Sequence, residues 1–241
     1  MLEAFLDESG THKGSHIVAV AGWVAHHGYW KKFLSQWGDR PFHAKDSKCD
    51  PLKYGLHDAI VDSDLNGFVA WMKPEDYGNH ANPVFKSAIG NACAVCTFDC
   101  ALGICKFAGK HRLGKVAFVI EDGQPNARFI QQVLDGMKER ERLGIASVTL
   151  ASKKDFVQLC TADFLAHSCT SEPEWFRTLV DSGLVANDYI TSERMVRMSN
   201  QLLHKYKLMK YNQGLLKAER RKNKAETHSM NDVNAKDETP Q

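Results

Sequence analysis

The sequence predicts an α/β fold built on a mixed sheet, in which three antiparallel strands are followed by parallel strands and helices. Two observations lead to this fold class. Short apolar segments with the length of strands recur along the chain, and in its second half they alternate with helical patterns. Strands that alternate with helices pair in parallel. With 241 residues, 43% of them hydrophobic, the chain is also long enough to bury a sizeable core.

The first half of the chain predicts a meander of three strands. The strand-like segments are residues 2–7, 16–25 and 67–73. The Ser9-Gly10 pair predicts the turn between the first two strands. Between the second and third strands, two helices are expected at residues 29–39 and 52–63, separated by a polar, Pro-flanked loop at residues 40–51.

The second half predicts two further strands among helices. The strands are residues 115–122 and 146–152, and the helices are residues 83–108, 126–142, 159–169 and most of 192–224. We therefore expect three parts: a folded domain over residues 1–190, a basic helical extension over 191–224, and a disordered tail over 225–241. The polar composition of the tail leaves too little apolar surface to bury.

Basic residues gather near the end of the chain. Residues 205–224 hold eight Lys and Arg residues and one acid, Glu219, although the formal net charge of the whole chain is only +2. A segment of this charge attracts polyanions, and Lys217, Arg220 and Arg221 are the candidate contacts with a nucleic acid. The alternative is a solvated helix face with no ligand.

The seven cysteines predict buried thiols in a reducing compartment. Cys93, Cys96 and Cys100 share one face of the predicted helix 83–108 and alternate with apolar residues. A Cys-x-x-Cys pair is half of a zinc site, but this context favours core packing. The sequence shows no secretory signal and no run of 18 uninterrupted apolar residues, so we expect a cytoplasmic protein without a membrane span.

Acidic residues follow two of the predicted strands and enter one late helix. Asp7 and Glu8 close the first strand, Glu121 and Asp122 close the fourth, and Asp163 lies among apolar residues in "TADFLAH". If the first and fourth strands are neighbours, these carboxylates meet at one edge of the sheet. Clustered carboxylates repel one another unless a cation compensates them, and Mg²⁺ or Mn²⁺ prefers such oxygen ligands. The alternative is that the acids are turn and helix-end residues.

Five segments together resemble the DUF3800 family of RNase H-like predicted nucleases. They are "FLDESGT" at 5–11, "VAVAGWV" at 18–24, "FLSQW" at 33–37, "FHAKD" at 42–46 and "TADFLAH" at 161–167. The resemblance implies an RNase H-like fold, with Asp7, one or both of Glu121 and Asp122, and Asp163 as metal ligands and catalytic residues. Glu8, adjacent to Asp7, is a further catalytic candidate.

The "FHAKD" segment adds groups that suit a phosphate substrate. The resemblance favours His43 as a catalytic acid or base and, with Lys45, as a substrate-binding residue. The sequence departs from the family at two places. Cys160 stands where members often have Gln, and Asp99 is the only candidate for an acid on the first long helix.

These observations predict a metal-dependent nuclease or related phosphoryl-transfer enzyme that acts on DNA or RNA. The resemblance implies a role in phage defence or a mobile element, with a homo-oligomer or a defence-system protein as further partners. One alternative is a catalytically inactive nucleic-acid- or protein-binding module of the same fold. Another is a haloacid dehalogenase-type phosphatase, which "FLDESGT" also resembles, although Ser9 replaces the second Asp of that signature.

Overall fold

A computed structural model describes residues 1–210 and 213, except residues 41, 46–49, 123–125 and 140–142. Its centre is a six-stranded sheet in the order β5-β4-β1-β2-β3-β6. The strands are β1 (Leu2–Ser9), β2 (Val18–His26), β3 (Asn66–Met72), β4 (Val116–Glu121), β5 (Ile145–Ala151) and β6 (Val185–Tyr189).

The pairing of the strands confirms the predicted fold class. Strand β2 runs antiparallel to both β1 and β3. The pairs β1–β4, β4–β5 and β3–β6 are parallel. A meander of three strands, extended beside β1 by two parallel strands, is the RNase H-like arrangement. Because β1, β4 and β5 are parallel neighbours, their carboxyl ends lie along one edge of the sheet.

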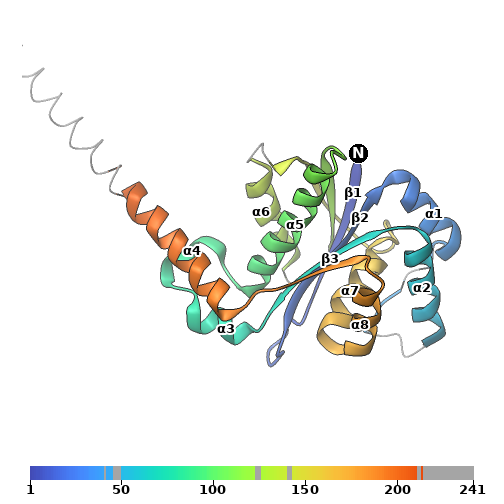
Figure 1. Ribbon diagram of the computed structural model, residues 1–241, viewed down its shortest axis with the longest axis horizontal. Helices are drawn as coiled ribbons and strands as arrows, with labels where there is room; N and C mark the ends of the chain where they lie inside the picture. Colours follow the sequence, from blue (N-terminus) through green and yellow to red (C-terminus); the bar gives the residue numbers. More distant parts are fainter. Residues whose placement is uncertain (41, 46–49, 123–125, 140–142, 211–212, 214–241) are drawn as a thin grey trace, which may run out of the picture.

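Helices cover both faces of the sheet (Figure 1). They are α1 (His27–Trp37), α2 (Asp50–Asp62), α3 (Pro74–His80), α4 (Pro83–Ile89), α5 (Ala92–Lys110), α6 (Ala127–Lys138), α7 (Leu159–Ser171) and α8 (Pro173–Asp181). Helices α5 and α6 lie on one face, and α1, α2, α7 and α8 lie on the other. Residues 192–210 form a further helix, whose far end extends away from the sheet.

Alternation along β1 divides its side chains between two cores. Ala4 and Leu6 enter the core beneath α5 and α6, whereas Phe5 enters the core beneath α1 and α7. Successive strand residues point to opposite faces, so Asp7 points to the same face as Phe5 and Glu8 points to the other. This alternation decides which of the two adjacent acids can join a site under α7.

The connection after β1 requires glycine at position 10. Gly10 has a φ of +73°, and a Cβ atom there would lie 1.8 Å from the carbonyl oxygen of Ile17. Only a residue without a side chain fits this close approach of two backbone segments. The predicted turn at the Ser9-Gly10 pair is wrong: β1 continues through Ser9, residues 10–17 connect it to β2, and the chain reverses at Lys13-Gly14, where the amide of Ser15 donates to the carbonyl of His12.

The single helix predicted over residues 83–108 is wrong, because the chain forms α4 and α5 there. Gly90, with a φ of +97°, ends α4, and the side chain of Asn91 then accepts a hydrogen bond from the Ala94 amide to start α5. This is a glycine stop followed by an Asn cap. Helices α3 and α8 and strand β6 were not predicted. The sequence of β6, "VANDY", is polar, as suits an edge strand.

Helix α5 is a core helix. Its length and hydropathy alone would let it cross a membrane, but 61% of its most apolar window is buried inside the protein. The six described cysteines are free and buried, and four of them lie on α5. This agrees with the core packing predicted for Cys93, Cys96 and Cys100.

The helix over residues 192–210 begins as part of the folded body. Met195 and Ser199 are buried, and the side chain of Asn82 donates hydrogen bonds to the backbone and side-chain oxygens of Ser199. Beyond these turns, Lys205, Lys207 and Lys210 are exposed. The predicted contacts Lys217, Arg220 and Arg221, and the tail over 225–241, lie outside the described residues.

Candidate active site

Three neighbouring parallel strands each bring one charged residue to the same corner of the sheet. Asp7 is near the end of β1, Glu121 is the last residue of β4, and Lys153 follows β5 by two residues. All three are buried. Each lies two positions after a residue of the core under α7, namely Phe5, Val119 or Ala151, and side chains two positions apart along a strand point to the same face. The three charged side chains therefore point to the face of the sheet that α7 covers.

Helix α7 brings the fourth charged residue, Asp163, over this corner. The helix is attached to the sheet at two points: the indole of Trp23 donates to the carbonyl of Thr161 at 3.0 Å, and the hydroxyls of Ser9 and Thr170 lie 2.7 Å apart. Between these points Asp163 is 7% exposed. A buried carboxylate in an apolar helix is costly unless it has partners, and here it has several.

The ammonium of Lys153 joins the three carboxylates. Its Nζ lies 2.6 Å from Glu121 Oε2, 3.2 Å from Asp163 Oδ2 and 3.4 Å from Asp7 Oδ2. Lys153 itself is 7% exposed. Lys153 was not among the site residues predicted from the sequence. The rule that selected the acids would have found it, because "ASKKD" also follows a strand that ends at this edge.

The carboxylates perturb one another electrostatically. Burial, hydrogen bonding to Glu121 and repulsion by Asp163 and Glu121 raise the pKa of Asp7, and the ammonium of Lys153 opposes this shift only in part. Burial would also raise the pKa of Asp163, but its hydrogen bond with His43 and the charge of Lys153 lower it. The three acids raise the pKa of Lys153, so this amine stays protonated. One ammonium thus compensates three acids incompletely.

The loop that carries "FHAKD" lies on α7 beside Asp163. The amide of Ala44 donates to Asp163 Oδ2 at 2.9 Å, and His43 Nδ1 lies 3.2 Å from the same oxygen. Hydrogen bonding to this carboxylate raises the pKa of His43. The side chain of His43 is 46% exposed, so it lies at the opening of the cluster. Lys45 is exposed nearby in the chain, and Asp46 lies outside the described residues.

Cys160 holds the other end of this loop. The amide of Phe42 donates to its sulfur at 3.1 Å, one turn of helix before Asp163. Burial raises the pKa of the thiol to about 11, so it remains neutral. Cys160 therefore positions the loop that carries His43, at the place where the resemblance leads one to expect Gln.

Glu8 and Asp122 differ from these three acids in the face of the sheet that they occupy or in burial. Glu8 is on the opposite face of the sheet, where the side chain of Asn126 donates to it at 3.3 Å. Asp122 follows Glu121 but is exposed, whereas Glu121 is buried and contacts Lys153. Of the two adjacent pairs, the structure brings Asp7 and Glu121 together with Asp163.

Asp99 is buried on the α5 side of the sheet, away from these acids. Its carboxylate lies 2.9 Å from the guanidinium of Arg194, which also contacts Asp188 at 2.6 Å. Burial raises the pKa of Asp99 to about 6, and Arg194 opposes the shift. These contacts attach the helix over residues 192–210 to the body, so Asp99 supports the fold rather than the candidate site.

The donor atoms of the cluster suit a hard divalent cation, but their present arrangement suits an ammonium. Three carboxylates from separate elements offer oxygens to one cation, as Mg²⁺ or Mn²⁺ requires. Among the described residues, however, no group of three or more His, Cys, Asp or Glu side chains is spaced to hold a metal ion. In the described structure the three carboxylates instead surround Lys153 Nζ.

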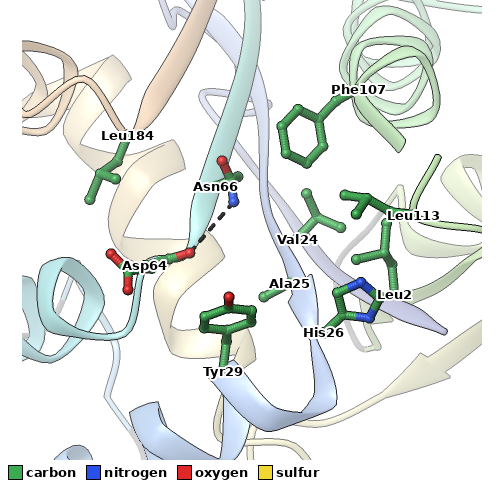
Figure 2. Close-up of a pocket in the computed structure, with 10 residues that line it drawn as sticks. All are labelled: Leu2, Val24, Ala25, His26, Tyr29, Asp64, Asn66, Phe107, Leu113 and Leu184. Atoms are coloured by element: carbon green, nitrogen blue, oxygen red, sulfur yellow. Dashed lines mark hydrogen bonds between the residues drawn. The ribbon is translucent and has the colours of Figure 1, made fainter. Parts of the chain in front are cut away.

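A cavity of about 370 Å³ lies elsewhere (Figure 2). Apolar side chains, among them Leu2, Phe107 and Leu184, make up most of its wall, and Tyr29 and His26 lie at one side. Leu2 begins β1, five residues before Asp7, which places the cavity about 16 Å along the strand from that carboxylate. The cavity is thus separate from the charged cluster.

The sequence matches no protein-family model and no curated protein. Among solved structures, the chain is similar to a chain of the PCNA:RNase HII complex from Archaeoglobus fulgidus. The two are 15% identical, with a TM-score of 0.44, over 85% of this chain and 90% of that chain. At this level of similarity the match carries no information on activity, and the fold class rests on the strand order itself.

Proposed function

We propose that the protein is a divalent-metal-dependent phosphodiester hydrolase acting on nucleic acid, with Asp7, Glu121 and Asp163 as its metal ligands. The observation that carries this proposal is the meeting of these three carboxylates, from β1, β4 and α7, around a single cation. Mg²⁺ or Mn²⁺ held there would activate a water molecule and compensate the charge of the phosphate. The resemblance to the DUF3800 family supports the same reaction class.

His43 is suited to act on the substrate side of the acids. Its half-exposed ring is oriented by Asp163, which also raises its pKa, so more of it is protonated at neutral pH than of an ordinary histidine. A protonated imidazole there can donate a hydrogen bond to a phosphate oxygen or a proton to the leaving oxygen.

A basic surface is available for the rest of a nucleic acid. Lys45 follows His43 and is exposed. The exposed Lys205, Lys207 and Lys210 begin the basic segment that continues through Lys217, Arg220 and Arg221 in the sequence. We propose that this segment contacts backbone phosphates. By resemblance, the biological setting is phage defence or a mobile element.

A second candidate is an inactive nucleic-acid- or protein-binding module. The position of the Lys153 ammonium among the acids favours it, because an internal cation stabilises the cluster without metal. The phosphatase alternative fits less well: its sheet is strongly parallel, whereas β2 here runs antiparallel to both neighbours.

Degradation of labelled single- and double-stranded DNA and RNA tests the proposal. The full chain, Asp7→Asn and Asp163→Asn are incubated with Mn²⁺ or Mg²⁺, and with a chelator. We expect wild type to cleave at least one substrate, and expect chelation and either substitution to stop it. If wild type and both variants leave every substrate intact, or cleave equally, the nuclease proposal fails; intact substrates that are nevertheless bound favour the module.

A further inference from the structure

Lys153 has more contacts with the acids than a surface lysine forming an ion pair. Its ammonium lies within 3.4 Å of one oxygen from each of Asp7, Glu121 and Asp163, and the side chain is 7% exposed. The ammonium donates hydrogen bonds to Glu121 and Asp7 and forms an ion pair with Asp163. The lysine lies two residues after β5, a strand that supplies none of the three acids.

The cluster needs a positive charge at this point. Three carboxylates confined at one buried corner repel one another, and each would also be costly to desolvate alone. One ammonium reduces this repulsion but leaves an excess of negative charge. The acids therefore attract a cation of higher charge even when Lys153 is in place.

The ammonium and a divalent ion compete for the same oxygens. Glu121 Oε2, Asp163 Oδ2 and Asp7 Oδ2 face Lys153 Nζ. An ion bound by all three would lie within a few ångströms of the ammonium, where like charges repel strongly. The four-carbon stem of lysine is flexible, so the ammonium can withdraw while the backbone stays in place.

We propose that Lys153 is a built-in counter-cation, which keeps the three carboxylates together in the metal-free protein and is displaced when a divalent ion binds. The inference rests on the proposed function for the identity of the ion. It adds a positioning residue just after β5. Lys153 lowers the affinity for the ion because its own contacts must be broken first.

Mn²⁺ binding to Lys153→Met tests the proposal by calorimetry on the full chain. Methionine keeps an unbranched apolar stem and removes the charge. We expect Lys153→Met to bind Mn²⁺ at least about tenfold more tightly than wild type, since a competing close charge pair is gone. Its melting temperature without metal should fall, and Mn²⁺ should raise it more than it raises that of wild type. The exposed neighbour Lys154 offers the matched control, Lys154→Met, which should behave as wild type.

A measurement on wild type covers the case in which Lys153→Met does not fold. Reductive methylation, read by mass spectrometry, should label Lys153 slowly without metal and several times faster with saturating Mn²⁺. Labelling of Lys154 should not change. If bound Mn²⁺ leaves Lys153 protected, or if Lys153→Met binds Mn²⁺ no more tightly than wild type, the proposal is overturned.

These outcomes separate the inference from the proposed function. If Lys153→Met binds Mn²⁺ tightly but neither it nor wild type cleaves any nucleic acid, the counter-cation role is supported and the proposed nuclease activity is rejected. Cleavage by wild type, with Mn²⁺ affinity unchanged in Lys153→Met, keeps the nuclease and overturns the counter-cation. Absence of Mn²⁺ binding in both proteins overturns the inference.

Discussion

Lys153 Nζ lies 2.6 Å from Glu121 Oε2, and both groups are buried where β4 and β5 end. The same ammonium contacts Asp7 and Asp163. Asp7, Glu121 and Asp163 therefore share one cation.

Substitutions of the adjacent residues Glu121 and Asp122 should have very different effects on the cleavage rate. Glu121 contacts Lys153, whereas Asp122 is exposed. We expect Glu121→Gln to lower the cleavage rate by about a hundredfold or more, because loss of groups that merely support metal ligands already costs 10–100-fold. Asp122→Asn should stay within about threefold of wild type. Initial cleavage rates on one labelled substrate with Mn²⁺ measure both effects. Equal losses of rate in the two variants would contradict the assignment of Glu121, rather than Asp122, to the site.

Glu8 provides a second comparison, across the sheet. Since it points to the face of α5 and α6, Glu8→Gln should retain cleavage within about threefold of wild type, whereas Asp7→Asn should lose it. Glutamine still accepts the hydrogen bond from Asn126, so the fold should be kept. The same assay, with circular dichroism as a check on folding, decides this. A large loss of cleavage in Glu8→Gln but not in Asp7→Asn would show that the site lies on the α5 and α6 face and that the proposed face is wrong.

Much of the fold, but only part of the candidate site, could be predicted from the sequence. Apolar runs and the strand-helix alternation predicted five of the six strands and the meeting of β1, β4 and α7. They favoured Asp7 over Glu8 as the metal ligand but kept Glu8 as a catalytic candidate, because the face of β1 that α7 covers cannot be read from β1 alone. Lys153 was missed because only acidic residues were sought at the strand ends. The Gly90 break between α4 and α5 was missed because the apolar pattern continues through it.

Exposed lysines on the last described helix should contribute to nucleic-acid binding. Replacing Lys205, Lys207 and Lys210 by Gln should weaken binding of an oligonucleotide and reduce the slope of log affinity against log salt by up to about 2–3. Fluorescence anisotropy between 50 and 200 mM salt would measure this. Lys31, Lys110 and Lys138, also exposed, provide a control variant of equal charge change. Equal slopes in the two triple variants would reject the basic surface.

The titration of Asp99 should make the stability of the protein depend on pH, independently of the charged cluster around Lys153. Its pKa in the folded protein is about 6, above the usual 3.8, so the folded state binds more protons than the unfolded state between these values. The free energy of unfolding should then fall as pH rises from 4 to 6, by about 2–3 kcal/mol. Asp99→Asn lacks this titration. Urea unfolding at pH 4.5 and 7 measures this. Between the two pH values, the free energy of unfolding of Asp99→Asn should fall less than that of wild type. A larger fall in the variant would contradict the assignment.

The most direct test of the central claim is the position of bound metal. A crystal of the wild-type protein soaked in Mn²⁺ should give an anomalous difference peak within coordination distance of Asp7, Glu121 and Asp163, with Lys153 Nζ moved away. If saturating Mn²⁺ gives no peak there and Lys153 still contacts all three carboxylates, the cluster is a structural ion-pair network and the proposed metal-dependent hydrolase is wrong.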